Sequence, residues 1–367
     1  MKRELYVINV AKYYGGGEIF MTKLAALLHA DRRVTVVSPY MKSMEDALKR
    51  ADAELIALPG DGPLSTRTGF LRWLWDNRRK FKSGSDLLLN SRSAAYLTPL
   101  VALISRVRPV VVAHTELSGK VTIKEVLYAT ALRFAGSVVC VSNTVADQHK
   151  RRWPTLKVAS IPNWLDGQRR SEIATVAASD LPIDVAVVAR LEDNKGVGDI
   201  LSACSKIANI RLHIYGDGPL RTQLEALAGK NSTVTFHGHV DDLSIRLPHH
   251  SMFISASRSE SFSYAVAEAI DAGLLCVVSD IPAHRELLGE HYPSALFFPS
   301  KDVEAAHTSV SSGLAMLVSS DDTRATDVIE QVRCRIELRN SPELARSHYI
   351  RILDECFGRT PIGGRPT

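Results

Sequence analysis

Long hydrophobic runs are missing from this 367-residue sequence, and no apolar stretch reaches the length that a bilayer-spanning helix needs. The best candidate, residues 97–104, is interrupted by Pro99 and followed by Arg106 and Arg108. Residues 1–4 lead directly into a strand-like run, without the apolar stretch of a secretory leader. We therefore expect a cytosolic protein.

Cysteine is scarce and scattered. The five cysteines show no Cys-x-x-Cys spacing, which argues against a disulfide framework and against a zinc site. No loop ends in Gly-Lys-Ser or Gly-Lys-Thr, so a Walker phosphate loop is excluded. We expect reduced thiols.

The sequence does have an uneven distribution of charge. Residues 1–165 contain 25 Lys and Arg against 13 Asp and Glu, a balance of +12, whereas residues 166–367 contain 20 against 27, a balance of −7. Since 367 residues exceed one ordinary core, this change marks a boundary between two domains. We expect one domain over residues 1–165, completed by a helix at about 340–367, and a second over residues 166–339.

Short apolar runs alternate with helical patterns along both halves, which indicates parallel α/β sheets. In the first half, a strand over residues 5–10 precedes Gly15, Gly16 and Gly17, and later strands are followed by His114 and by Asn143. Residues just past the carboxyl ends of parallel strands line ligand-binding crevices. These positions are therefore candidates for ligand contact, although a lone histidine is more often structural.

An aromatic and basic segment stands out at residues 70–82. Phe70, Trp73, Leu74 and Phe81 can share one helical face, with basic residues around it. This composition suits an anionic membrane surface, and it also suits a helix that packs its aromatics on the sheet. Given the basic first half, we predict peripheral binding to the inner face of the cytoplasmic membrane through Trp73, Arg78, Arg79 and Lys80.

Residues 255–279 place two acids around an expected helix start. Glu260 follows a strand-like run, and Glu268 lies one to two turns inside the helix. Ser261 or Ser263 is the expected N-cap, and Gly273 suits the position after the helix end. Free amides at a helix start suit a phosphate. A nucleotide-sugar site needs a loop acid, an anion site and a helix acid in one segment. An ordinary βαβ unit with solvated acids has the same pattern.

Two cations, Arg190 and Lys195, follow another strand. Such cations can hold a diphosphate and stabilise charge on a departing nucleotide, and two solvated loop cations would look the same. The glycines at 216 and 218 form only part of a dinucleotide fingerprint, because Arg221 stands where the third glycine belongs. Four histidines (His237, His239, His249 and His250) lack acids or cysteines at ligand spacing, so we expect no metal site.

Taken together, these motifs resemble the retaining glycosyltransferases of family 4. The resemblance rests on the order of Val-Ala-Arg-Leu-Glu-Asp-Asn-Lys-Gly (188–196), Tyr-Gly-Asp-Gly-Pro (215–219), His-Gly-His-Val (237–240) and the acids Glu260 and Glu268. It covers nearly the whole chain and is strongest over residues 183–299. It implies an α/β GT-B fold, in which two Rossmann-like parallel-sheet domains face each other across a cleft. The first domain would bind the acceptor and the second the nucleotide sugar.

The resemblance also implies roles for individual residues. Arg190 and Lys195 would bind the diphosphate, Glu268 the ribose hydroxyls and Glu260 the transferred sugar. His114 would contact the sugar and the reaction centre, so that the catalytic set is Glu260, Lys195, Arg190 and His114. The remaining contacts would be a loop of Gly15, Gly16 and Gly17 over the phosphates, His239 and Val240 near the base, the amides of Ser261, Phe262 and Ser263, and Asn143 on the acceptor side.

One departure from the family concerns the first acid, which the family commonly places in Glu-Gly-Phe-Gly. Here Ser261 and Ser263 replace the two glycines, and Phe262 is kept. Serine restricts the backbone and adds two hydroxyls near the expected sugar. The identity of the donor sugar therefore stays open.

We expect a retaining, metal-independent enzyme that uses no cofactor and no nucleic acid partner. It would transfer a sugar from a nucleotide-diphosphate sugar, UDP favoured over GDP, to a saccharide or lipid-linked saccharide. Cell-surface polysaccharide or lipopolysaccharide biosynthesis is the expected setting. The alternatives are a hydrolase or epimerase on the same fold, an inactive nucleotide-sugar-binding protein, and a nicotinamide oxidoreductase, whose fingerprint both glycine loops miss.

Overall fold

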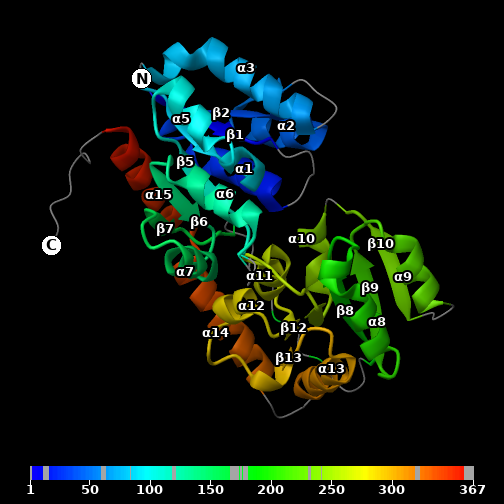
Figure 1. Cartoon of the computed structure of the whole chain (residues 1–367). Coiled ribbons are helices and arrows are strands. Elements are labelled where there is room, and N and C mark those ends of the chain that lie inside the picture. Colours follow the sequence, from blue (N-terminus) through cyan, green and yellow to red (C-terminus); the bar gives the residue numbers. More distant parts are fainter. Residues whose placement is uncertain are drawn as a thin grey trace, which may run out of the picture. The chain divides into compact units, whose positions relative to one another are not determined.

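The computed structural model describes residues 2–10, 16–58, 63–82, 84–117, 121–165, 173, 176, 181–229, 233–240, 242–318 and 323–358 (Figure 1). The chain divides into two compact units. Unit 1 comprises Met1–Asp166 and Pro342–Thr367, and unit 2 comprises Gly167–Ser341. Each unit is built on one parallel sheet.

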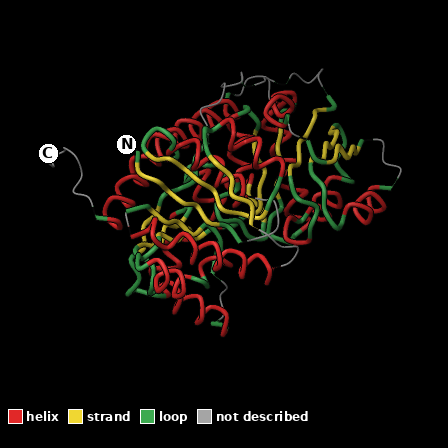
Figure 2. Tube along the Cα trace, turned by 90° about the horizontal axis from the view of Figure 1, so that it is seen from above, coloured by secondary structure: helices red, strands yellow, loops and turns green. Residues whose placement is uncertain are grey.

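Unit 1 has a seven-stranded sheet in the order β3-β2-β1-β4-β5-β6-β7, with every neighbouring pair parallel. The strands are β1 (Arg3–Ile8), β2 (Arg32–Pro39), β3 (Glu54–Leu58), β4 (Asp86–Leu89), β5 (Val110–Ala113), β6 (Ser137–Cys140) and β7 (Val158–Ser160). The helices are α1 (Gly16–Leu28), α2 (Lys42–Arg50), α3 (Pro63–Lys82), α4 (Arg92–Ala95), α5 (Thr98–Ser105), α6 (Ile123–Leu132), α7 (Asn143–Arg152) and α15 (Pro342–Phe357). Figure 2 shows the strands in yellow among the helices in red.

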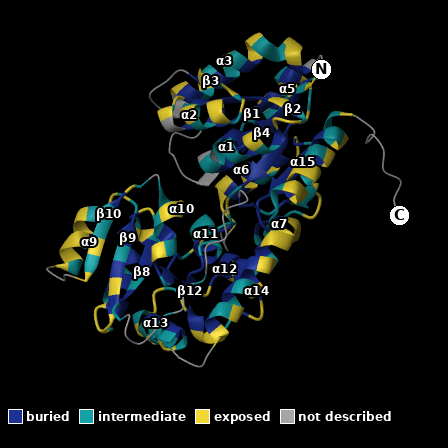
Figure 3. Cartoon of the chain, turned by 180° about the vertical axis from the view of Figure 1, so that it is seen from behind, coloured by how far each residue is buried: buried dark blue, intermediate teal, exposed yellow. Residues whose placement is uncertain are grey.

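The central strand β1 is buried on both of its faces, which explains its nearly continuous apolar sequence. Leu5 and Val7 belong to a core with residues of α1, α2 and α15. Tyr6 and Ile8 belong to a second core with residues of α3 and α6. Figure 3 shows β1, β2 and β4 largely in the dark blue of buried residues.

The last helix, α15, completes the first of these cores. Tyr349 is fully buried and lies within 6.2 Å, between ring centroids, of both Phe20 and Trp164. At the same helix, Asp354 accepts from Arg32 at 2.5 Å, and Arg32 also pairs with the buried Asp86 at 2.9 Å. Burial raises the pKa of the Asp86 carboxyl, and the neighbouring arginines oppose that shift.

The aromatic segment at residues 70–82 forms part of α3, and its apolar face is turned inward. Phe70 and Phe81 are buried, and Trp73 lies 5.5 Å from the ring of Tyr6. Trp73 is half-buried and its ring packs against the core, and the membrane contact expected of it remains a prediction. Arg79 and Lys80 are exposed and Arg78 is half-buried, so the membrane contact expected of these three residues remains a prediction.

Unit 2 has a six-stranded parallel sheet in the order β10-β9-β8-β11-β12-β13. The strands are β8 (Ile183–Val188), β9 (Ile210–Tyr215), β10 (Val234–Gly238), β11 (Met252–Ser255), β12 (Leu275–Ser279) and β13 (Phe297–Phe298). The α-helices are α8 (Val197–Cys204), α9 (Arg221–Ala228), α10 (Leu243–Arg246), α11 (Tyr264–Asp271), α12 (Pro282–Leu288), α13 (Val303–Val318) and α14 (Arg324–Arg339). The described part of unit 2 also contains the short 3-10 helices η2 (Asp193–Lys195), η3 (Leu247–His249) and η4 (Ser294–Leu296).

Candidate active site

The carboxyl edge of the unit 2 sheet is built from loops that lie very close to one another. Gly216 has φ +126°, and a Cβ atom there would lie 2.0 Å from the carbonyl oxygen of Ala189. A Cβ atom on Gly218 would lie 2.5 Å from the carbonyl oxygen of Leu191, whose amide donates to Asp217 at 3.0 Å. These two glycines therefore let the β9 loop approach the loop that carries Arg190.

The segment around Lys195 is fixed against the loop that follows β11. A Cβ atom on Gly196 would lie 2.4 Å from the carbonyl oxygen of Ala256, so only glycine fits there. The amide of Arg258 donates to the Asn194 carbonyl at 2.8 Å, and the Asn194 side chain donates to the Ser259 carbonyl at 3.1 Å. The two loops therefore hold each other at defined positions.

Within this frame, Lys195 and Glu260 form an ion pair. The Lys195 Nζ atom lies 2.5 Å from the Glu260 Oε1 atom, and both side chains are partly buried. The Ser257 hydroxyl also donates to Glu260 Oε1, at 2.8 Å. The structure thus brings together the cation and the first acid, which are 65 residues apart in sequence.

A chain of hydrogen bonds behind Glu260 was missed by sequence reasoning. The Ser279 hydroxyl donates to the Ser257 carbonyl at 2.6 Å, and His284 Nδ1 donates to the Ser279 carbonyl at 2.8 Å. His284 is fully buried, and burial lowers its pKa, so the ring is neutral at pH 7. The available signal was the position of Ser279 at the carboxyl end of the strand next to β11.

The start of α11 differs in one respect from the expectation. Ser263 is the residue before the first helical turn, but its side chain makes no capping hydrogen bond. Its φ is +70°, in the left-handed region that the family's glycine adopts more easily. Gly273 has φ +93° directly after the helix end, which confirms its expected position.

The other expected donor contacts of unit 2 lie along the same edge. Glu268 is half-buried inside α11, and Ser261 and Phe262 lie in the loop before that helix. Arg190 is half-exposed in the β8 loop, and its Nε atom lies 3.5 Å from Glu192 Oε2. His239 and Val240 follow β10 and are exposed and half-buried, respectively.

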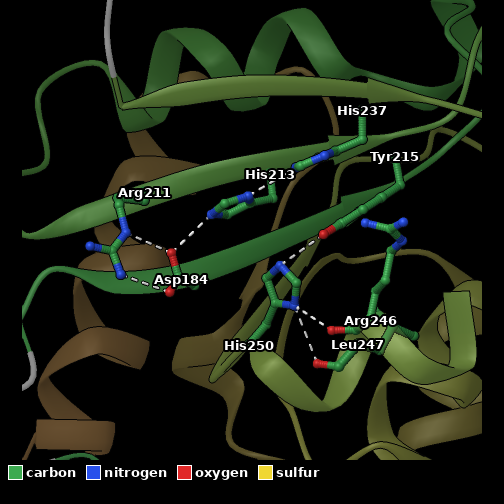
Figure 4. A network of polar contacts seen from close by, with 8 residues as sticks. All are labelled: Asp184, Arg211, His213, Tyr215, His237, Arg246, Leu247 and His250. Carbon is green, nitrogen blue, oxygen red and sulfur yellow. Dashed lines mark hydrogen bonds and ion pairs between the residues drawn. The ribbon is translucent and has the colours of Figure 1, made fainter.

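A histidine network lies on β8, β9 and β10 beside the expected base position (Figure 4). Asp184 accepts two bonds from Arg211 at 2.7 Å and one from His213 at 2.8 Å, and His213 lies 3.0 Å from His237. His237 stacks on Tyr215 at 4.5 Å between ring centroids. Burial lowers the pKa of His237, which favours a neutral ring. Among the described residues, no group of three or more His, Cys, Asp or Glu side chains could hold a metal ion.

The carboxyl edge of the unit 1 sheet carries neutral polar side chains. Asn9, Asn90, His114 and Asn143 follow β1, β4, β5 and β6, which are neighbours in the sheet. Asn9 and Asn90 are buried, whereas Asn143 is exposed as the first residue of α7. The two buried asparagines had no motif to identify them, and their place just after apolar strands was the only signal.

His114 is held by one of these asparagines. Its Nε2 atom lies 2.8 Å from Asn90 Oδ1, and its ring lies 4.8 Å from Phe20, edge to face. With the amide oxygen facing it, Nε2 carries the proton. The ring is partly accessible, yet the surrounding protein desolvates it and lowers its pKa to about 4. His114 is therefore a neutral hydrogen-bonding group at physiological pH.

The glycine loop of unit 1 is only partly within the described residues. Gly15 lies outside them, whereas Gly16 and Gly17 are the first two residues of α1 and not part of a loop. The amides of a first helical turn have no partner within the helix. Gly16 and Gly17 therefore carry two such amides.

Two family models match the chain, each over one unit. The model described as "Glycosyltransferase Family 4" matches residues 14–169, and the model described as "Glycosyl transferases group 1" matches residues 182–315. No curated protein sequence gives a significant match.

Several solved structures share the fold at low sequence identity. HepE from Anabaena, in complex with UDP and glucose, is 14% identical, with 96% of this chain and 99% of HepE covered and a TM-score of 0.80. Sucrose-phosphate synthase from Thermosynechococcus elongatus is 16% identical over 98% and 100% of the two chains, with a TM-score of 0.77. The lipopolysaccharide outer core galactosyltransferase WaaB is 15% identical over 96% and 99%, with a TM-score of 0.69. The chain therefore belongs to the glycosyltransferases of the family 4 type and has the GT-B fold of two parallel-sheet α/β domains.

Proposed function

We propose that this glycosyltransferase moves a sugar from a UDP-sugar to a saccharide or lipid-linked saccharide, with retention of the anomeric configuration. The observation that carries the proposal is the Lys195–Glu260 pair at the carboxyl edge of the unit 2 sheet, directly before α11. The pair supplies one cation for a phosphate and one carboxylate for sugar hydroxyls, and both are held by the loops around them.

The cations support a role at the leaving diphosphate. Arg190 and Lys195 lie in one loop, and the amides at the start of α11 add partial positive charge. Charge that develops on the departing phosphate would be met by groups that are already in place. Metal independence follows as a proposal, because these fixed cations supply the positive charge that a metal ion would otherwise provide.

The proposed reaction takes place on one face of the sugar. The bond between C1 and the phosphate oxygen breaks, and a bond between C1 and the acceptor hydroxyl oxygen forms on the same side. The acceptor proton passes to the departing phosphate oxygen. Glu260 would orient the transferred sugar, Glu268 the ribose, and neutral His114 a sugar hydroxyl. His239 and Val240 would contact the base.

The choice of UDP and of the acceptor class is supported by structural relatives. HepE has been solved with UDP and glucose, and WaaB is a lipopolysaccharide galactosyltransferase. We propose a cell-surface polysaccharide pathway on this ground. A hydrolase or epimerase on the same fold would use the same donor site.

The test measures nucleotide release from a panel of UDP- and GDP-sugars, with and without saccharide acceptors. We expect release that depends on the acceptor, a product with the donor's anomeric configuration by NMR, and no loss of rate in EDTA. Release at the same rate without acceptor would identify a hydrolase instead. A thermal-shift screen with the same donors identifies the sugar, because a ligand that binds the folded state raises its apparent stability.

A further inference from the structure

Helix α6 exposes an apolar stripe to solvent. Ile123, Val126, Leu127 and Phe134 are all exposed, with Ile123 at 81%. Their spacing of three, one and seven residues places them along one side of the helix and its C-terminal extension. The opposite side, with Tyr128 and Leu132, is buried in the core. Apolar residues therefore occupy both sides of α6, and packing within unit 1 accounts for only one of them.

Helix α5 extends this surface. Leu103 is 74% exposed and Leu100 is exposed as well. The two helices lie side by side, because Tyr96 Oη, just before α5, donates to the Lys124 carbonyl at 3.0 Å, and Arg108 Nη2, just after α5, donates to the Arg133 carbonyl at 2.5 Å. We call the exposed residues Leu100, Leu103, Ile123, Val126, Leu127 and Phe134 the α5–α6 surface. Figure 1 labels the two helices.

The exposed charges on α5, on α6 and just after the two helices have one sign. Arg106, Arg108 and Arg133 are exposed where the two helices end, and Lys124 is exposed where α6 begins. Helix α5 has no charged residue, and the one acid of α6, Glu125, is buried. Exposed Leu, Ile and Phe side chains with arginines beside them have the composition of a surface that lies on an anionic bilayer.

We propose that the α5–α6 surface docks on an anionic membrane, with its apolar side chains among the lipid headgroups and its arginines on lipid phosphates. No helix in the described part of the chain is long and apolar enough to cross a membrane, so the contact is peripheral. A second copy of the chain fits less well. A two-fold contact through this surface would bring the arginines of both copies together without an exposed acid on α5 or α6 to pair with them.

Flotation with vesicles tests the proposal. The probe is phosphatidylcholine vesicles with about one third phosphatidylglycerol, compared with phosphatidylcholine alone. We expect the wild type to float with the anionic vesicles and about tenfold less with the neutral ones. The double variant Leu103→Glu with Ile123→Glu should lose about tenfold or more of the binding to anionic vesicles, because a charge replaces each apolar contact.

A matched control uses two exposed apolar residues of unit 2. Ile245 and Leu338 are 67% and 79% exposed, so the variant Ile245→Glu with Leu338→Glu adds the same charge elsewhere on the chain. It should float as the wild type does. The proposal is overturned if the wild type does not bind anionic vesicles, if both variants lose binding equally, or if light scattering shows a wild-type dimer that the Leu103→Glu, Ile123→Glu variant converts to a monomer.

The arginines give a second, independent readout. Arg106→Glu with Arg133→Glu should reduce binding at low salt by about tenfold and flatten its dependence on ionic strength. The Leu103→Glu, Ile123→Glu variant and the Arg106→Glu, Arg133→Glu variant both leave the proposed donor site unchanged. Nucleotide release in vesicle-free solution should therefore stay at the wild-type rate, which separates a failure of membrane docking from a failure of the proposed transfer.

Discussion

The carboxyl edges of the two sheets differ in the kind of polar group that they present. In unit 2 the edge carries charged pairs, Lys195 with Glu260 and Arg258 with Asp193. In unit 1 it carries asparagines and a histidine whose pKa is about 4. Two sheets of the same architecture therefore offer an ionic surface and a neutral one.

The proposed function gives each edge a different task. A diphosphate needs fixed positive charge, whereas sugar hydroxyls need neutral donors and acceptors that keep their protonation state. On the ionic edge, Gly196, Gly216 and Gly218 let neighbouring loops pack in van der Waals contact, which fixes the charged groups. On the neutral edge, the side-chain amide of Asn90 holds His114. The same fold thus obtains two chemistries from the residues that follow its strands.

Removal of the cation from the ionic edge should have the largest effect. Lys195→Ala should lower kcat by about 10²–10³ with a smaller change in the KM for donor, because the lysine acts on charge that appears in the transition state. Steady-state kinetics with the preferred UDP-sugar measures this. Lys206→Ala, which removes a surface lysine 3.4 Å from Glu304, should leave both constants unchanged. Full turnover in Lys195→Ala would mean that the two edges do not differ in function.

The neutral edge can be tested through pH. The pKa of His114 is about 4 in the folded protein, below the ordinary value of 6.5, so the unfolded chain takes up this proton first as pH falls. His114 therefore lowers the free energy of unfolding as pH decreases from about 6.5 to about 4, by up to about 3 kcal/mol. In urea unfolding, the free energy of unfolding of His114→Gln should fall less than that of the wild type as pH decreases over this range.

A control and a second readout accompany the His114 experiment. Gln replacement of the exposed His291 should leave the pH profile of unfolding as in the wild type. Transfer by the wild type should show no titration of His114 between pH 6 and pH 8. An acid limb of kcat near pH 6.5 that disappears in His114→Gln would show that the ring is charged in the working range, contrary to a neutral edge.

Glu268, the acid inside α11, tests whether the ionic edge also binds the donor. Glu268→Ala should weaken UDP-sugar binding by about 10-fold to 100-fold, the effect of losing hydrogen bonds to a charged group. Isothermal titration gives the dissociation constant. The control Glu304→Ala removes an acid that is 79% exposed and should leave affinity unchanged. Equal affinity in Glu268→Ala and wild type would rule out the ribose contact.

The smallest expected effect concerns Ser263. Replacement by glycine should raise the free energy of unfolding by a few tenths to about 1 kcal/mol. Glycine removes the backbone strain at φ +70°, and this gain exceeds the cost of the larger conformational entropy that glycine gives the unfolded chain. Urea unfolding measures it. Asn209 has φ +67°, but asparagine tolerates this region, so Asn209→Gly should gain less. A shift in preferred donor sugar for Ser263→Gly alone would assign specificity to this position.

The sequence predicted the strands well where they are buried on both faces. A strand is predicted over residues 5–10, and β1 covers Arg3–Ile8, because a continuous apolar run between loops has few other solutions. The same periodicity identified the apolar face of α3 but not its partner. A pattern shows which side chains avoid water, and it does not show whether protein or lipid covers them.

The site was predicted where a motif existed and missed where only spatial position mattered. Lys195 and Glu260 were identified from the family motifs, and they lie in contact. Asn90 and His284 were missed, because an asparagine after a strand and a histidine early in a helix are common in sequence. Their roles depend on neighbours far away in the chain, such as His114, which is 24 residues from Asn90.

The placement of α15 in unit 1 has a consequence for synthesis. Residues 342–357 supply Ala345, Tyr349, Ile352 and Leu353 to a core whose other buried members lie before residue 166. On the ribosome, residues 1–166 therefore wait for a segment that is made after unit 2, whereas unit 2 can complete its own core first. A chain released before α15 would leave an apolar groove and the arginine of the Arg32–Asp354 pair uncovered. Chaperones and proteases could use that exposed groove to recognise unfinished chains.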